Sequence, residues 1–241
     1  MTGRLWSDNP ALSRFLEKQM RNWELSHSQR PGGGLPSRGE VAQFLTIGNI
    51  VGAGGNDVAA TLGEELGWPV FDRQILTAMA GDHELRARLY RTMDERDLGW
   101  FESIFRALML EEFRKDDYFH RLVETVLVLA RKGPAIFVGR AADLILPEGK
   151  GFRVKLIASL EYCAGSFASR NNTTPAEARR EVERIEAERR AFIEHHFQID
   201  AYEPTRFDLL INVERFTTRQ AVDLILSAMR LRGILADSPH R

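Results

Sequence analysis

The feature that most constrains the fold is the segment from Phe44 to Asp72, which reads FLTIGNIVGAGGNDVAATLGEELGWPVFD. It contains an apolar run, a glycine-rich turn, an amphipathic stretch, a second apolar run and a carboxylate. The first run is typical of a buried strand, and the stretch from about Asn56 to Leu66 is typical of a helix. Gly52, Gly54 and Gly55 would let the backbone turn sharply and approach a ligand without a Cβ.

A helix that follows such a turn directs its first backbone N–H groups and the positive end of its dipole back at the turn. That arrangement binds anions, of which phosphate is the obvious one. The segment therefore predicts a phosphate-binding strand, turn and helix, although a strand-to-helix connection that binds nothing can share the pattern.

Two classes of nucleotide-binding protein begin in this way. The P-loop pattern G-x-x-x-x-G-K-[ST] uses its lysine on the phosphates and its hydroxyl on magnesium. Gly48 and the pair Ala53 and Gly54 approximate its frame, but Gly55 and Asn56 stand where the lysine and the serine or threonine are expected.

The second class carries the dinucleotide pattern G-x-G-x-x-G. Gly52 and Gly54 fit this pattern, and Asp57 does not. Asp72 lies at about the distance where a ribose-binding carboxylate is expected. The glycine turn alone therefore leaves both classes open.

Composition narrows the class of protein. With 241 residues, 44% hydrophobic and 28% charged, we expect a soluble globular protein with a substantial core. A formal net charge of -1 gives no general attraction to nucleic acid or to an anionic membrane, so phosphate binding must come from local arginines. The single cysteine, Cys163, excludes an internal disulfide and a cysteine-rich metal site, and no metal-ligand residues are predicted. No apolar run is long enough to span a membrane and residues 1–30 lack a signal-peptide core, so we expect a cytoplasmic protein.

The N-terminal region, residues 1–40, is predicted to be an appendage. Asn9 to about Leu25 has the spacing of an amphipathic helix, and the polar segment SHSQRPGGGLPSRGE after it is typical of a flexible tether. The apolar stripe of this helix must be buried on its own domain or on a partner subunit, so a homodimer through the helix is one of two alternatives.

The remaining elements alternate between helices and strands. The stretch from Asp72 to residue 132 is mainly helical in pattern. Three apolar runs predict core strands at Ala135 to Val138, Phe152 to Ser159 and Phe207 to Val213, and a last helix follows from about Thr217 to Leu231. This alternation implies an α/β fold with a mainly parallel, five-stranded sheet covered on both faces.

A long helix between the fourth and fifth strands is the best defined of the chain. Thr174 is placed as its N-cap, Pro175 at its first position, and Glu177 completes a capping box. Five arginines crowd this helix: Arg179, Arg180, Arg184, Arg189 and Arg190. They could contact phosphate, or they could pair with glutamates at i,i+4 on a solvated surface.

Taken in order, these elements resemble the cytidylate kinase-like family of P-loop proteins, relatives of the nucleoside monophosphate kinases. The resemblance covers most of residues 44–228. It is carried by TIGNIVGAGGNDVAATLGEELGWPVFDRQIL, FVGRAADLIL, FRVKLIASLEYCAGSFASRN, EARREVERIEAERRAFIEHHF and FDLLINVERFTTRQAVDLIL. The order and spacing of these segments disfavour the dinucleotide alternative.

The resemblance implies a P-loop kinase fold for residues 41–241, a three-layer α/β/α arrangement with a helical monophosphate-binding insertion at 73–132 and a mobile lid at 161–206. It also implies ATP- and Mg2+-dependent phosphoryl transfer to a nucleoside monophosphate, with CMP as the acceptor. Such a reaction needs in-line positioning and compensation of charge on the transferred group.

The family's functional residues carry over to matching positions. The phosphate-binding turn would comprise Gly52, Ala53, Gly54, Gly55, Asn56 and Asp57. Asp72 would orient the acceptor phosphate or a magnesium-bound water, and Arg73 would contact the acceptor phosphate. Arg140, in the GR pair, matches an arginine that binds the monophosphate in related kinases. A plain helix cap remains the alternative for Asp72, and a surface ion pair for Arg140.

The lid would contribute Arg189, together with Arg184 and Arg190. The resemblance thus gives a catalytic set of Asp72, Arg140 and Arg189.

The sequence departs from the family around the turn. Family members often carry Ser-Arg-Glu before the turn and an arginine after it, where this chain has GNI at residues 48 to 50 and Asn56. Lys155, Arg170 or the lid could supply the missing charge. The alternative to an enzyme is a degenerate kinase fold that acts as a nucleotide-binding sensor or a protein scaffold.

Overall fold

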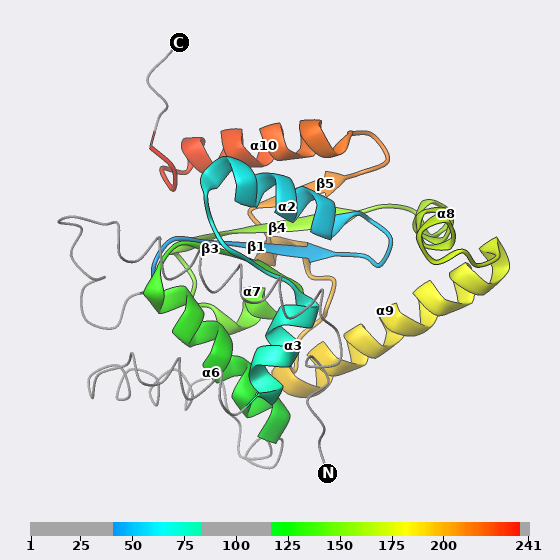
Figure 1. Ribbon diagram of the computed structural model, residues 1–241, viewed down its shortest axis with the longest axis horizontal. Helices are drawn as coiled ribbons and strands as arrows, with labels where there is room; N and C mark the ends of the chain where they lie inside the picture. Colours follow the sequence, from blue (N-terminus) through cyan, green and yellow to red (C-terminus); the bar gives the residue numbers. More distant parts are fainter. Residues whose placement is uncertain (1–40, 83–116, 237–241) are drawn as a thin grey trace. The chain divides into compact units, whose positions relative to one another are not determined.

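The computed structural model describes residues 41–82 and 117–236. The helix expected before residue 40, with the dimer contact suggested for it, and the middle of the helical insertion lie outside the described residues. Five strands form one sheet in the order β2-β3-β1-β4-β5 (Figure 1). The strands are β1 (Phe44–Asn49), β2 (Val70–Phe71), β3 (Ala135–Val138), β4 (Gly151–Ile157) and β5 (Leu209–Asn212).

The sheet confirms the predicted α/β class. β2 pairs with β3 and β4 pairs with β5, in both cases in parallel. The described residues divide into two compact units, one containing residues 41–44, 67–82 and 117–150 and the other containing residues 45–66 and 151–236.

The first unit is built from α3 (Arg73–Gly81), α6 (Asp117–Lys132) and α7 (Ala142–Ile145) beside β2 and β3. α6 packs against both α3 and α7. Its buried side chains recur at helical spacing and include Phe119, Leu122, Val123 and Val126. On the strands, the rings of Phe71 and Phe137 stack with centroids 5.6 Å apart. The middle of this unit is therefore an apolar core.

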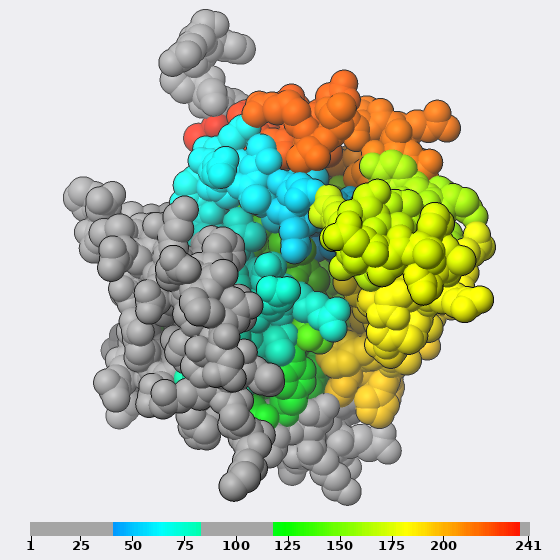
Figure 2. Space-filling model, turned by 45° about the vertical axis from the view of Figure 1, so that its right-hand side comes forward, coloured from blue at the N-terminus to red at the C-terminus, as the bar shows by residue number. Residues whose placement is uncertain are grey.

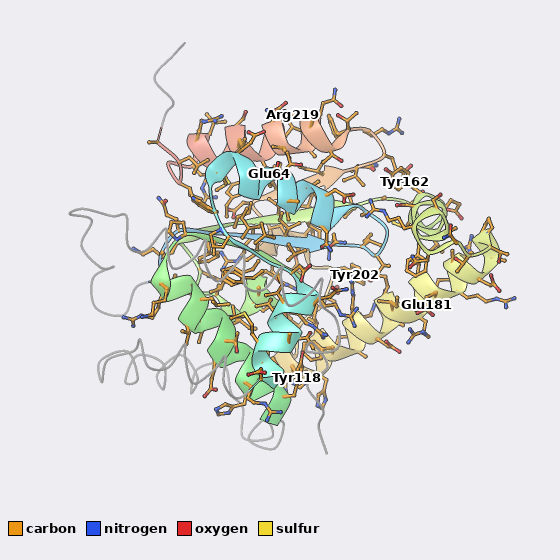
Figure 3. All side chains as sticks on the ribbon, viewed as in Figure 1. Glu64, Tyr118, Tyr162, Glu181, Tyr202 and Arg219 are labelled. Atoms are coloured by element: carbon orange, nitrogen blue, oxygen red, sulfur yellow. The ribbon has the colours of Figure 1, made fainter. Side chains whose placement is uncertain are left out.

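The second unit carries the glycine turn. β1 leads through the turn into α2 (Gly55–Leu66), which packs beside α10 (Thr218–Leu231). Arg219 of α10 forms an ion pair with Glu65 of α2, and Figure 3 labels Arg219 on the outer side of α10. Three helices lie between β4 and β5 in the sequence: α8 (Leu160–Asn171), α9 (Pro175–Phe197) and the short 3-10 helix η2 (Pro204–Arg206).

The lid helix α9 confirms the sequence prediction at its first turn. The N–H of Glu177 donates to Thr174 Oγ1 over 3.3 Å, and the N–H of Thr174 donates to Glu177 Oε2 over 3.1 Å. The hydroxyl of Thr174, which donates to Glu177 Oε2 over 2.7 Å, and then the N–H of Thr174 lower the pKa of Glu177. α9 packs along α8 but buries few side chains, and Figure 2 shows both helices at the molecular surface. α9 is thus well formed locally but contributes few side chains to the core.

Two strands are shorter than the sequence predicts. β4 ends at Ile157 because Ser159 is the N-cap of α8 and accepts from the N–H of Tyr162 over 3.2 Å. β5 begins at Leu209 because Phe207 still belongs to the end of η2, its N–H donating to the Pro204 carbonyl over 3.1 Å. Local side-chain and turn hydrogen bonds override the apolar pattern at these ends.

None of the helices in the described part of the chain has both the length and the apolar character needed to cross a membrane.

Candidate active site

The glycine turn has the backbone conformation that the sequence predicts. Gly52 and Gly54 have φ of 92° and 72°, a region that residues with a Cβ rarely adopt. A Cβ on Gly52 would lie 2.3 Å from the carbonyl oxygen of Cys163 on α8. The sequence assigned this glycine to close approach of a ligand, whereas the structure shows that it lets the turn approach the backbone of α8.

The other glycines of the turn have different surroundings. A Cβ on Gly55 would lie 2.6 Å from the side chain of Asn49, which donates from Nδ2 to the Ile50 carbonyl over 2.9 Å. A Cβ on Gly54 would meet only Asp57 Oδ2, at 3.8 Å. Gly54 is thus the position where the turn is open. Its carbonyl accepts from the N–H groups of Asp57 and Val58 in the first turn of α2, over 3.1 and 3.2 Å.

Cations reach the turn from other elements. On β4, Lys155 has its Cδ 3.2 Å and its Nζ 3.7 Å from the place of a Cβ on Gly48. On α8, Arg170 forms an ion pair with Asp57 in the first turn of α2. On α9, Arg189 donates from Nη1 to the Asn49 carbonyl over 2.9 Å. Each of these side chains brings positive charge where the turn itself has no lysine.

Lys155 lies in an aromatic setting. Its Nζ is 5.6 Å from the ring centroid of Tyr202 and 5.6 Å from that of Phe207. Contacts of an ammonium group with aromatic rings are favourable. They hold the Lys155 ammonium near Gly48 of β1. The lack of a side chain on Gly48 provides the space that the Lys155 stem occupies.

A carboxylate that sequence reasoning missed also lies at the turn. Glu186 Oε1 accepts from the N–H of Val51 over 2.9 Å and from Arg189 Nη1 over 2.8 Å. Its Oε2 accepts from the hydroxyl of Tyr202 over 3.2 Å. Nothing in the sequence marks this glutamate among the many of α9, because its partner Val51 is 135 residues away.

The remaining lid arginines differ in environment. Arg184 is exposed and pairs with Glu181 and Glu188 along the helix, which is the solvated i,i+3 and i,i+4 pairing that the sequence left open. The Arg190 guanidinium lies 4.7 Å from the centroid of Tyr202, and its hydrogen bond to that phenol raises the pKa of Arg190. Figure 3 labels Tyr202 beside α9 and Glu181 farther along the same helix.

Two groups beside the turn titrate above their ordinary range. Burial raises the pKa of the Cys163 thiol to about 11, and the carboxylates of Glu186 and Glu214 add to the effect. Burial also raises the pKa of Tyr202. Cys163 is therefore an inert, protonated thiol at neutral pH, and Tyr202 is a hydrogen-bond donor.

In the first unit, Asp72 is the N-cap of α3. Its Oδ1 accepts from the N–H groups of Gln74 and Ile75, each over 2.9 Å. The capping alternative that the sequence left open is therefore present, and it uses one of the two carboxylate oxygens. Arg73, exposed in the first turn of α3, is next to it in the chain. The catalytic roles of both residues stay predictions.

Arg140 follows β3 on an unusual backbone. Gly139, Arg140 and Ala141 have φ of 70°, 54° and 55°, so two successive residues with a Cβ adopt the left-handed conformation. Such strain is typical of sites that hold a ligand or position a side chain. Arg140 Nη2 donates to Thr77 Oγ1 on α3 over 3.0 Å, and its guanidinium lies 5.9 Å from the ring centroid of Tyr118.

Thr77 and Tyr118 hold the Arg140 side chain and were not predicted from sequence. Tyr118, which Figure 3 labels on α6, has its hydroxyl 3.5 Å from Thr77 Oγ1. A threonine and a tyrosine in two amphipathic helices give no motif, so only the packing of α3 on α6 reveals them.

Within residues 41–82 and 117–236, no group of three or more His, Cys, Asp or Glu side chains could hold a metal ion. Mg2+ in phosphoryl-transfer sites is usually bound by one or two carboxylates together with the nucleotide phosphates and water. Asp72 could supply such a carboxylate, because both of its capping hydrogen bonds use Oδ1 and neither uses Oδ2.

Comparison with known proteins finds relatives by sequence and a similar fold among solved structures. The cytidylate kinase of Halobacterium salinarum is 26% identical over 187 residues, which cover 77% of this chain and 88% of that protein. The cytidylate kinase of Methanothrix thermoacetophila is 27% identical over 188 residues, which cover 78% of this chain and 98% of that protein. The crystal structure of an uncharacterized protein from Eubacterium ventriosum shares the fold, with a TM-score of 0.63 at 17% identity over 78% of this chain and 98% of that one.

A family model gives the broader match. The model of the cytidylate kinase-like family matches residues 44–215, a segment that begins at β1 and contains the glycine turn, Asp72, Arg140, α8 and α9. The match starts where the sequence resemblance starts and includes each position to which that resemblance assigned a function. The chain therefore belongs to the cytidylate kinase-like family.

Proposed function

We propose that this protein transfers the γ-phosphoryl group of ATP to a nucleoside monophosphate, with CMP as the preferred acceptor. The observation that carries the proposal is the set of cations around the glycine turn. Lys155, Arg170 and Arg189 come from β4, α8 and α9 and reach positions beside the turn, where the family's usual basic residues are missing. Charge lost from the turn is thus replaced from other elements.

The reaction needs no covalent enzyme intermediate. An oxygen of the acceptor phosphate attacks the γ-phosphorus of ATP, the bond from that phosphorus to the β,γ-bridging oxygen breaks, and ADP leaves. The protein contributes by aligning the two phosphates and offsetting their charge. The first-turn amides of α2, together with Lys155, Arg170 and Arg189, would do this for ATP.

The acceptor phosphate would be bound by the first unit. Arg140 is held ready by a strained backbone and by Thr77, so it loses little conformational freedom when it binds an anion. Arg73 would add a second cation, and Asp72 would orient the acceptor phosphate or a Mg2+-bound water. Mg2+ bound to the nucleotide would neutralise charge that develops on the phosphates.

A second candidate is a nucleotide sensor without catalytic turnover. It is favoured by the carboxylates at the turn, because Asp57 pairs with Arg170 and Glu186 accepts from the Val51 amide. Each carboxylate competes with phosphate for the same donors. Retention of Asp72 and of the positioned Arg140 favours the enzyme.

The test is ADP formation from Mg-ATP with CMP, dCMP, UMP, AMP and GMP. One or two acceptors should support turnover, and Asp72→Asn should lower kcat by at least about a hundredfold. Because asparagine is as good an N-cap as aspartate, this change removes the charge and keeps the cap of α3. Glu64→Gln, which neutralises an exposed carboxylate of α2, is the control.

Full activity of Asp72→Asn would remove Asp72 from the mechanism. No ADP with any acceptor, from a protein that unfolds cooperatively on heating, would favour the sensor.

A further inference from the structure

The carboxylate of Glu186 is surrounded by hydrogen-bond donors from three segments of the second unit. They are the backbone N–H of Val51 in the turn, the guanidinium of Arg189 on α9 and the hydroxyl of Tyr202 before η2, at 2.9, 2.8 and 3.2 Å. The Glu186 side chain is only 15% exposed. A largely desolvated anion therefore occupies the glycine turn in this structure.

Several cations lie around this carboxylate, and the carboxylates of Glu194 and Asp200 act on one of them, Arg190. The Tyr202 ring has Arg190 at 4.7 Å and Lys155 at 5.6 Å from its centroid. Arg189 is also tied to the turn by its hydrogen bond to the Asn49 carbonyl. If Glu186 moved away, the Val51 amide, the Arg189 guanidinium and the Tyr202 hydroxyl would remain beside the turn as hydrogen-bond donors.

We propose that Val51, Arg189 and Tyr202 form an oxyanion site for a phosphate group of the nucleotide, and that Glu186 occupies this site until the nucleotide displaces it. The proposal rests on nucleotide binding at the glycine turn, as in the proposed function. It adds a resident competitor and names the donors for which the two anions compete.

The chemistry of the donors supports the exchange. An amide N–H, a guanidinium and a phenol all donate and bind carboxylate and phosphate oxygens alike. Arg189 would keep its bond to the Asn49 carbonyl while its bond to Glu186 passes to the phosphate. Release of Glu186 also frees α9 from one of its few ties to the turn, so the exchange couples nucleotide binding to lid movement.

Competition of this kind lowers the apparent affinity of the site. When the competent state is present in only one molecule in about ten, the measured Kd is about tenfold weaker than the intrinsic one. A carboxylate tethered on the same chain has a high effective concentration, so it competes well even with a multivalent anion.

The experiment is calorimetric titration of the full chain with sodium tripolyphosphate, and separately with ATP. Glu186→Gln keeps an oxygen for the Val51 amide but removes the charge, and Glu186→Ala removes the occupant. We expect both variants to bind tripolyphosphate at least about tenfold more tightly than the parent chain. The control is Glu183→Gln, which removes the same charge from the exposed face of α9 where Glu183 pairs with Arg179.

An affinity of Glu186→Gln and Glu186→Ala within twofold of Glu183→Gln, or weaker than the parent, would overturn the proposal. Thermal unfolding of each variant checks folding, and Tyr202→Phe, which removes one donor to Glu186, is a milder test. Because Tyr202 is also a phosphate donor, its loss should tighten tripolyphosphate binding less than the loss of Glu186. Equal or greater tightening would contradict the assigned role of Tyr202.

The two proposals fail in different ways. Tighter tripolyphosphate binding by the Glu186 variants, with no ADP formed from any acceptor, would keep the oxyanion site and reject the kinase. ADP formation with unchanged tripolyphosphate binding would keep the kinase and reject Glu186 as competitor.

Discussion

Gly52 shows how one position can serve a site without contacting its ligand. Its φ of 92° requires glycine, and the carbonyl of Cys163 occupies the space that a Cβ would need. The sequence predicted a glycine turn here, and the structure confirms it. The reason for this glycine could not be predicted, because α8 is more than a hundred residues farther along the chain.

Substitution of Gly52 should strongly destabilise the fold. Gly52→Ala combines left-handed strain with a backbone clash, so we expect the free energy of unfolding to fall by about 3 to 5 kcal/mol. Gly67→Ala is the matched control, because Gly67 has φ of 64° but open space around its Cβ position, and it should cost about 1 to 2 kcal/mol. Urea denaturation of the two variants measures the difference; equal losses would show that the contact with α8 relaxes freely.

Among the elements, α9 and α10 begin with the same capping motif but bury different numbers of side chains. Thr174 and Thr217 both cap with a reciprocal capping box. α10 has five buried side chains, Ala221, Val222, Ile225, Leu226 and Met229. α9 is 23 residues long and has three. The sequence predicted the capping box at Thr174, since a capping box lies within four residues. The capping box at Thr217 was not predicted, and neither was how tightly each helix is held.

This contrast predicts different outcomes for the same substitution. Thr217→Ala should lower the global free energy of unfolding by about 1 kcal/mol, because α10 unfolds with the core. Thr174→Ala should speed amide exchange in the first turns of α9. It should lower the global free energy of unfolding by less than half as much as Thr217→Ala does. Hydrogen exchange and urea denaturation on both variants provide the readouts. If Thr174→Ala lowered the global free energy of unfolding as much as Thr217→Ala, α9 would unfold only together with the core.

For the whole molecule, the division into two units matches a division of labour between the proposed substrates. The glycine turn, α8 and α9 belong to the unit of residues 45–66 and 151–236, whereas Asp72 and Arg140 belong to the other unit. The parallel sheet, the turn and the lid helix were predicted from sequence because each depends on short-range pattern. The division itself depends on packing between segments far apart in the chain and was not predicted.

Each nucleotide should therefore protect a different unit from exchange. ATP alone should slow amide exchange around residues 50–60 and in α9, and CMP alone should slow it in α3 and around Arg140, because bound ligands stabilise the segments that contact them. Hydrogen exchange read by mass spectrometry, with each nucleotide added separately, measures this. Protection of the α3 and Arg140 segments by ATP alone would contradict the assignment of substrates.

The sequence by itself determined the order of strands and helices along the chain, the glycine turn, the cap of α9, and the family. These features depend on residues within a few positions of one another, where backbone sterics and local hydrogen bonds decide. Only the tertiary structure decided which charges meet at the turn. Glu186 lies 135 residues from Val51, and Arg170 lies 113 residues from Asp57. Contacts over such separations depend on how whole helices pack, and no local pattern encodes that.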